Sequence, residues 1–116
     1  MITTPQDTDE ERLLQKIVDV IVRERSPQVI ILFGSRARGD ARADSDVDLL
    51  IIEQEPFSPQ RSRRKEVAHL QMALRRLPFS KDILLYSREE FEHWRHSFNH
   101  LIGRASREGK VLHGRL

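Results

Sequence analysis

A short charged connection between two apolar runs constrains this chain more than any other feature. The runs Val29–Phe33 and Val47–Ile52 are continuous and apolar, as expected for strands that are buried on both faces of a sheet. The connection begins at Gly34 and ends at Asp46. It can hold one helical turn, but it is tight for the long crossover that parallel strands need. We therefore predict that these two strands pair in the antiparallel direction.

The start of this connection has the composition of an anion site. Gly34 has no Cβ, so the backbone can turn sharply there and come close to a ligand. If Ser35 caps a helical turn, the free N–H groups of that turn point outward, an arrangement that binds phosphate oxygens. Arg36 and Arg38 follow, and their forked donors would add to the same site. This stretch therefore predicts phosphate binding.

The end of the connection has the composition of a metal site. Asp46 and Asp48 are one residue apart, so on an extended chain they face the same side, about 6.5 to 7 Å apart at Cα. Two such carboxylates can hold Mg²⁺, and one pair can bridge two ions spaced by roughly 4 Å, as in displacements at phosphorus. Asp44 lies two residues before Asp46, so on an extended chain it would face the same side and could be a ligand by geometry alone.

The same residues could also form an ordinary solvent-exposed turn that binds no ligand. Gly-Ser turns are common, and aspartates before a strand often do no more than keep an exposed turn in solution. The combination of strand, glycine turn, basic loop and acidic strand start favours the functional interpretation, because motif matches carry weight only in their structural context.

These residues resemble the signature of the DNA polymerase beta superfamily of nucleotidyltransferases. The resemblance rests on Gly34-Ser35, followed after ten residues by Asp46-Val47-Asp48. The spacing in the family implies that Asp46 and Asp48 are the ligands and that Asp40 and Asp44 are solvated loop charges. The segment Gly-Ser-Arg-Ala-Arg-Gly is most similar to the corresponding segment of the minimal nucleotidyltransferases that serve as antitoxins beside HEPN toxins. The resemblance implies an α/β nucleotidyltransferase fold, with a small mixed sheet and helices packed against it.

The resemblance also implies a reaction and a set of roles. A nucleoside monophosphate, AMP from ATP, would pass to an acceptor hydroxyl with release of pyrophosphate. Gly34 and Ser35 would hold the β- and γ-phosphates with help from Arg36 or Arg38, and Asp46 and Asp48 would ligate two Mg²⁺ ions. In the family a third carboxylate stands at the start of a later strand, which makes Asp82 the candidate for the ion that activates the acceptor. These three aspartates are thus the predicted catalytic and metal residues.

The resemblance further suggests a partner. Larger relatives carry a domain that grips the acceptor, and we expect 116 residues to leave no room for one. A second subunit in a homodimer, or a partner protein, would then supply the acceptor side. The expected acceptor is a tyrosine of a HEPN toxin, which would make this chain an antitoxin of the type VII kind.

Other functions remain open at this stage. The chain could be a binding module that neutralises its partner by occlusion, with a vestigial site. It could also transfer the nucleotide to a small molecule such as an aminoglycoside, or to RNA, although the missing acceptor domain weighs against both. Nothing in the sequence identifies the nucleotide base.

Composition agrees with a folded protein. Hydrophobic residues make up 38% and charged residues 33% of the chain, outside the range of disordered sequences, and the length predicts one domain over residues 1–116. The absence of cysteine excludes disulfides and thiolate ligands. No apolar run approaches membrane-spanning length, and residues 1–11 lack a signal pattern, so we expect no membrane association and a cytoplasmic location. A net charge of +2 is too small to indicate nucleic-acid binding by itself.

Periodicity and capping signals predict the remaining elements. In chain order, they are a helix from a capping box at Thr8 to about Arg25, a helix over Gln60–Leu77, a strand over Asp82–Tyr86, a helix from a capping box at Ser87 to about His96, a last helix after a break near Ser97 that ends at Gly109, and a short strand over Lys110–His113.

A basic cluster marks the start of the predicted helix over Gln60–Leu77. Its members are Arg61, Arg63, Arg64 and Lys65. Such runs are usually a solvated face, but contact with phosphates, RNA or an acidic partner is the alternative, because basic charge at a helix start opposes the helix dipole. The five histidines form no metal motif, and we interpret His96 and His100 as surface residues.

Overall fold

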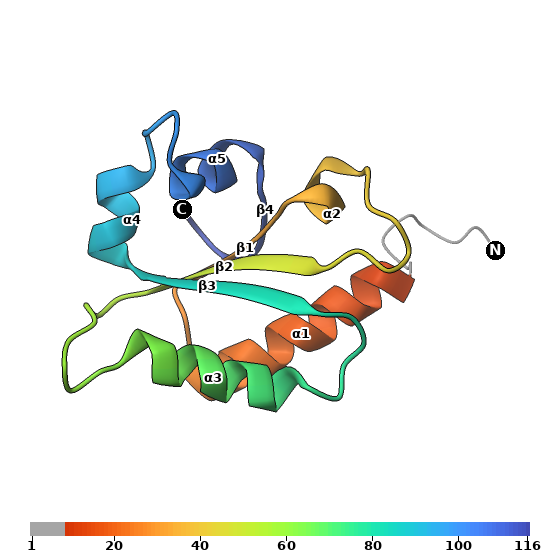
Figure 1. The fold of residues 1–116 in the computed structure, drawn as a ribbon, viewed down its shortest axis with the longest axis horizontal. Coiled ribbons are helices and arrows are strands. Elements are labelled where there is room, and N and C mark those ends of the chain that lie inside the picture. Colours follow the sequence, from red (N-terminus) through yellow and green to blue (C-terminus); the bar gives the residue numbers. More distant parts are fainter. Residues whose placement is uncertain (1–8) are drawn as a thin grey trace.

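The protein is a four-stranded mixed sheet with helices on both faces. The computed structural model describes residues 9–116, and the strands lie side by side in the order β3-β2-β1-β4 (Figure 1). The elements in chain order are α1 (Asp9–Arg25), β1 (Val29–Phe33), α2 (Ser35–Arg38), β2 (Val47–Glu53), α3 (Arg63–Leu74), β3 (Lys81–Ser87), α4 (Arg88–Trp94), α5 (Leu101–Glu108) and β4 (Lys110–Gly114).

The strand pairing confirms the prediction made from the short connection. β1 and β2 are antiparallel, with Phe33 opposite Asp48, and the connection holds the single helical turn of α2. β2 and β3 are parallel, and the whole of α3 lies in the crossover between them. β4 pairs antiparallel with β1, with an irregularity in register between Ile30 and Ile31. The mixed α/β fold expected from the sequence is therefore confirmed.

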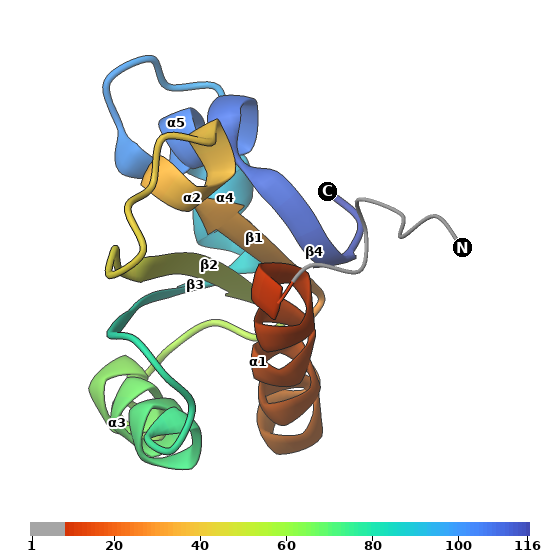
Figure 2. The same ribbon diagram turned by 90° about the vertical axis from the view of Figure 1, so that its right-hand side faces the viewer.

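The alternation of side chains along the strands divides the core into two layers. Ile30, Leu49 and Ile83 belong to the cluster that packs against α1 and α3, whereas Ile31 and Leu50 belong to the cluster covered by α4 and α5. Figure 2 shows α1 and α3 on one side of the sheet and α4 and α5 on the other. Because successive strand residues point to opposite faces, this division assigns the side chains of β1, β2 and β3 to a side of the sheet.

Local signals place several helix ends correctly. α1 ends at Arg25, before Ser26 and Pro27, as predicted. Ser87 and Glu90 form the predicted capping box of α4, with both reciprocal hydrogen bonds present. The predicted cap at Thr8 lies outside the described residues.

Other predicted boundaries are wrong for identifiable reasons. α3 begins at Arg63 rather than Gln60, because Ser62 caps it by accepting from the Lys65 N–H, and it ends at Leu74 rather than Leu77. At that end the Lys81 ammonium donates to the Leu74 carbonyl oxygen at 3.0 Å and also to the Leu77 carbonyl oxygen. Burial lowers the pKa of this lysine. The carbonyls released by the helix end are thus satisfied by the residue that opens β3.

The C-terminal region also differs from expectation. α4 ends at Trp94 instead of His96, and α5 starts only at Leu101. His100 is not a plain surface residue, because its Nδ1 accepts from the Ile102 N–H at 3.1 Å and caps α5. α5 ends at Gly109, as predicted, but the backbone of this glycine is extended rather than left-handed. A Cβ there would lie 2.4 Å from Ile31 Cγ2, so close packing explains this glycine.

Within residues 9–116, no helix is both long enough and apolar enough to cross a bilayer. The cytoplasmic location and the single domain over residues 1–116 stay predictions.

A network of charged side chains fastens α1 and α3 to the end of β2. Glu53 is 5% exposed and accepts from Arg25 at 3.0 Å and from Arg61 at 2.6 Å, while Arg25 also pairs with Glu66 at 2.5 Å. Hydrogen bonds and charge attraction from the two glutamates raise the pKa of Arg25 against the opposing effect of its burial. Arg63 pairs with Glu90 of α4 at 2.6 Å. Two members of the predicted basic cluster are therefore structural.

Removal of Glu53 should destabilise the fold strongly. Glu53→Ala removes one of the two carboxylates that Arg25 and Arg61 share and leaves only Glu66 for both guanidinium groups. We expect a loss of about 2 to 3 kcal/mol in the free energy of unfolding, measured by urea denaturation. Glu92→Ala is the matched control, because the Glu92 side chain is 50% exposed and its pairs with Arg88 and Arg95 lie at the surface. That variant should lose less than about 1 kcal/mol. Equal losses in the two variants would contradict the structural role of the network.

Candidate active site

Asp48 and Asp82 stand opposite each other on neighbouring strands. Each is the second residue of its strand, and the parallel register pairs them directly. Their sequence neighbours Leu49 and Ile83 point toward α1 and α3. The two carboxylates therefore point to the other face of the sheet, at the edge where β2 and β3 begin.

Asp46 adds a third acidic group at the same edge. It directly precedes β2 and is exposed, as is Asp82, whereas Asp48 is half-buried. Within residues 9–116 none of these three side chains makes an ion pair with an arginine, lysine or histidine. By contrast, Asp40 pairs with Arg38 at 3.3 Å in the loop. The edge of the sheet thus carries uncompensated negative charge.

The surroundings of Asp48 change its proton affinity. Burial raises the pKa of Asp48, the charges of Asp82 and Asp46 raise it further, and Arg38 and Arg36 offset part of the increase. A bound cation would reverse this effect, because it favours the charged form of each carboxylate.

The donor set is suited to Mg²⁺, which takes oxygen ligands and is usually bound by one or two carboxylates together with water and substrate phosphate. No group of three acidic or histidine side chains in the described part of the chain is close enough to hold a metal ion by itself. If a metal ion binds at this edge, Asp48 and Asp82 would supply two of its ligands, and water or a substrate would have to supply the others.

Gly34 closes one side of the acidic group that Asp46, Asp48 and Asp82 form. It has a positive φ of 73° and stands before α2, and a Cβ at this position would lie 2.1 Å from Asp48 Oδ2. A side chain here would therefore meet both backbone strain and a direct clash. Glycine is required so that the start of α2 can lie against the Asp48 carboxylate.

α2 presents the N–H groups of its first turn beside this glycine. The Gly34 carbonyl accepts from the Ala37 and Arg38 N–H groups at 3.1 Å, and no side chain caps the turn. The first N–H groups of a helix have no partner within the helix. Ser35 is the first residue of α2, so the two halves of the predicted motif meet at one edge of the sheet.

Arg36 has a different environment from the one the sequence suggested. Its guanidinium donates to the Ser45 carbonyl oxygen at 2.6 Å, pairs with Glu10 of α1 at 2.8 Å and lies over the Phe79 ring at 4.7 Å. Its side chain is only 6% exposed. Arg36 thus ties the residue before Asp46 to α1 and to the loop that leads into β3.

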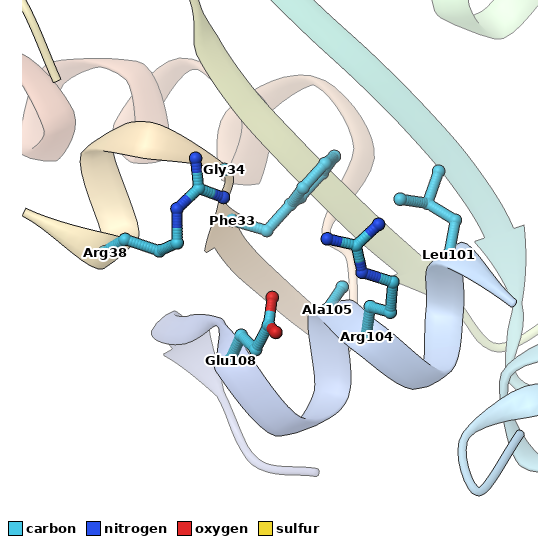
Figure 3. Close-up of a pocket in the computed structure, with 7 residues that line it drawn as sticks. All are labelled: Phe33, Gly34, Arg38, Leu101, Arg104, Ala105 and Glu108. Atoms are coloured by element: carbon cyan, nitrogen blue, oxygen red, sulfur yellow. The ribbon is translucent and has the colours of Figure 1, made fainter. Parts of the chain in front are cut away.

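Arg38 points toward a pocket between α2 and α5. This pocket, of about 190 Å³, also contains Gly34 and Phe33 in its wall, and α5 contributes Arg104 and Glu108 (Figure 3). Sequence reasoning missed these two residues of α5. The only available signal was that Arg104 and Glu108 are one helical turn apart, which by itself describes any solvated helix face.

Comparison with known proteins agrees with this geometry. The family model for polymerase beta nucleotidyltransferases matches residues 15–115, which is most of the chain. The chain belongs to this family. The superfamily identified from Gly34-Ser35 and Asp46-Val47-Asp48 is thereby confirmed. No curated protein matches the chain significantly.

Two solved structures share the fold. A candidate nucleotidyltransferase from Sulfolobus solfataricus, solved at 1.40 Å, is 17% identical with a TM-score of 0.60, and the match covers 90% of this chain and 79% of that one. A toxin–antitoxin structure with AMP-PNP is 20% identical with a TM-score of 0.55, covering 87% of this chain and 73% of that one. At these identities the similarity establishes the fold of this member of the family.

The raised pKa of Asp48 leads to a prediction for stability. Because folding raises this pKa, the folded state binds more protons than the unfolded state between the two pKa values, and Asp48 makes folding less favourable as the pH rises through that window. Asp48→Asn should therefore be more stable than the wild type at pH 7, by a few degrees in the thermal midpoint, since about 1 kcal/mol shifts a small domain by roughly 4 °C.

The gain should shrink as the pH falls and vanish well below the ordinary aspartate pKa of about 3.9, where the carboxyl is protonated in both the folded and the unfolded state. Asp44→Asn serves as the control, because Asp44 is exposed in the loop and outside the acidic group. A variant Asp48→Asn that is less stable than the wild type at pH 7 would contradict the crowding of charge at this edge.

Proposed function

We propose that this protein transfers AMP from ATP to an acceptor hydroxyl and releases pyrophosphate. Membership of the nucleotidyltransferase family supports the reaction class. The observation that carries the proposal is the direct register pairing of Asp48 with Asp82, beside a glycine that has no room for a side chain. Carboxylates placed in this way are suited to hold divalent cations against a triphosphate.

The proposed chemistry is an in-line displacement at the α-phosphorus. The acceptor oxygen forms a bond to this phosphorus, the bond from the phosphorus to the bridging oxygen breaks, and pyrophosphate leaves with the electron pair. Asp46 and Asp48 would hold two Mg²⁺ ions, with Asp82 as the third ligand. These ions would neutralise the charge on the phosphates. Asp82 stands opposite Asp48 at the open edge, where it would also receive the proton of the acceptor hydroxyl.

The remaining residues would hold the phosphates. In this proposal the N–H groups that follow Gly34 and the hydroxyl of Ser35 donate to the β- and γ-phosphates. Arg38 is exposed on the last turn of α2 and adds its charge. The sequence also suggested Arg36 as a phosphate ligand. Its existing contacts with Ser45 and Glu10 favour a role in holding the acidic loop in place. Positioning and charge neutralisation would supply most of the rate.

For the acceptor, we propose a tyrosine of a HEPN toxin. The segment Gly-Ser-Arg-Ala-Arg-Gly resembles the corresponding segment of antitoxins of this kind. One structure with the same fold is that of a toxin–antitoxin with AMP-PNP. In this role the protein is an antitoxin that silences its partner by modification. Occlusion of the partner without chemistry is the second candidate.

Incubation with α-labelled ATP, Mg²⁺ and the product of the neighbouring gene tests the proposal. We expect label to appear on the partner, and Asp46→Ala or Asp48→Ala to reduce the transfer rate by about 10³-fold or more while binding to the partner is kept. Asp44→Ala is the matched control. It removes an exposed carboxylate that lies two residues before Asp46 and outside the acidic group.

Two results would contradict the proposal. Transfer by the double variant Asp46→Ala, Asp48→Ala would refute the assignment of the metal ligands. Neutralisation of the partner by this double variant, with no label transferred by the wild type, would instead establish occlusion.

A further inference from the structure

The pocket between α2 and α5 is lined by charged and apolar residues. Phe33, Leu101 and Ala105 supply apolar surface, and Arg38, Arg104 and Glu108 supply the charge. Figure 3 shows the two guanidinium groups and the carboxylate pointing into the space between the two helices. Three ionisable groups from two elements thus meet in one small hollow.

The charges in this pocket are not satisfied by one another. Arg104 and Glu108 are one turn apart on α5, yet neither makes an ion pair within residues 9–116, and Arg38 is paired only with the exposed loop residue Asp40. The pocket therefore carries two guanidinium groups and one carboxylate, a net positive charge. Guanidinium groups are the donors that proteins use most for phosphate, because their forked geometry matches its oxygens.

The pocket shares a wall with the acidic edge of the sheet. Gly34 lines the pocket, and the position of its absent Cβ lies 2.1 Å from Asp48 Oδ2. Phe33, which also lines the pocket, is the register partner of Asp48 on β1. A chain of phosphates held at Asp48 can therefore continue past Gly34 into the pocket without leaving the surface.

We propose that this pocket binds the terminal phosphate of the nucleoside triphosphate, with Arg104 of α5 as a binding residue beside Arg38. The inference rests on the proposed function, and it adds a residue from outside the family motif. Glu108 opposes the same ligand: its carboxylate offsets one of the two guanidinium charges and limits how tightly triphosphate and released pyrophosphate are held.

Calorimetric titration with ATP, pyrophosphate and AMP in the presence of Mg²⁺ tests the pocket without any acceptor. Arg104→Gln should weaken binding of ATP and pyrophosphate by about tenfold, which is the lower end of the range for a charge-assisted hydrogen bond because the side chain is exposed. AMP binding should change less than about twofold, because AMP has no terminal phosphates to reach the pocket. Glu108→Gln should have the opposite effect on affinity and tighten ATP and pyrophosphate binding by about threefold.

Arg64→Gln is the control for a general charge effect. Arg64 is exposed on α3, which covers the other face of the sheet, so its loss should leave all three affinities unchanged. The inference is overturned if Arg104→Gln and Arg64→Gln act equally, if AMP is weakened as much as pyrophosphate, or if the wild type binds no pyrophosphate.

Failure of this inference is distinct from failure of the proposed function. A wild type that transfers label while Arg104→Gln keeps full affinity for ATP would overturn the pocket alone. A wild type with the predicted set of affinities that transfers no label to any partner would overturn the transferase proposal and leave a triphosphate-binding pocket.

Discussion

The mutual repulsion of carboxylates at the start of β2 and β3 is the interaction on which the rest of the site depends. Asp48 and Asp82 are held opposite each other by the hydrogen-bonded register of two parallel strands, and both neighbours of Asp48 along β2, Val47 and Leu49, are buried. The strands cannot slip by one residue without moving apolar side chains to the wrong face. The fold therefore forces like charges together, and a cation is the simplest means of relieving the resulting cost.

Several parts of the structure hold this arrangement in place. Lys81 opens β3 one residue before Asp82, and its ammonium caps the end of α3, so the crossover helix determines where β3 begins. Arg36 performs a similar task on the other side, where it links the Ser45 carbonyl to α1 and to Phe79. Both cations are buried and both act on backbone carbonyls. They position the acidic residues, whereas Arg38 and Arg104 lie in the wall of the neighbouring pocket.

The predictions from the sequence are correct where the interactions join residues close together in the chain, and they fail where the contacts join distant segments. The strands Val29–Phe33 and Val47–Ile52, their antiparallel direction and the capping box at Ser87 depend on neighbouring residues, and these predictions are confirmed. The C-terminal end of α3 depends on Lys81 from the next strand and could not be read from periodicity, whereas its start is set by the neighbouring cap residue Ser62. The same applies to the site. The family motif in the sequence indicated Asp46 and Asp48, whereas the contacts of Arg36 with Glu10 and Phe79 and the approach of α5 arise from packing between segments far apart in the chain.

The pKa of Asp48, followed by NMR of its side-chain carboxyl carbon with and without Mg²⁺, tests the account most directly. In the absence of metal, burial and the charges of Asp82 and Asp46 should hold this pKa above that of an ordinary aspartate, and Asp82→Asn should lower it. Addition of Mg²⁺ with a non-hydrolysable ATP analogue should lower it below the ordinary value. A pKa of Asp48 that is ordinary without metal, and insensitive both to Asp82→Asn and to Mg²⁺, would show that these carboxylates do not share a site.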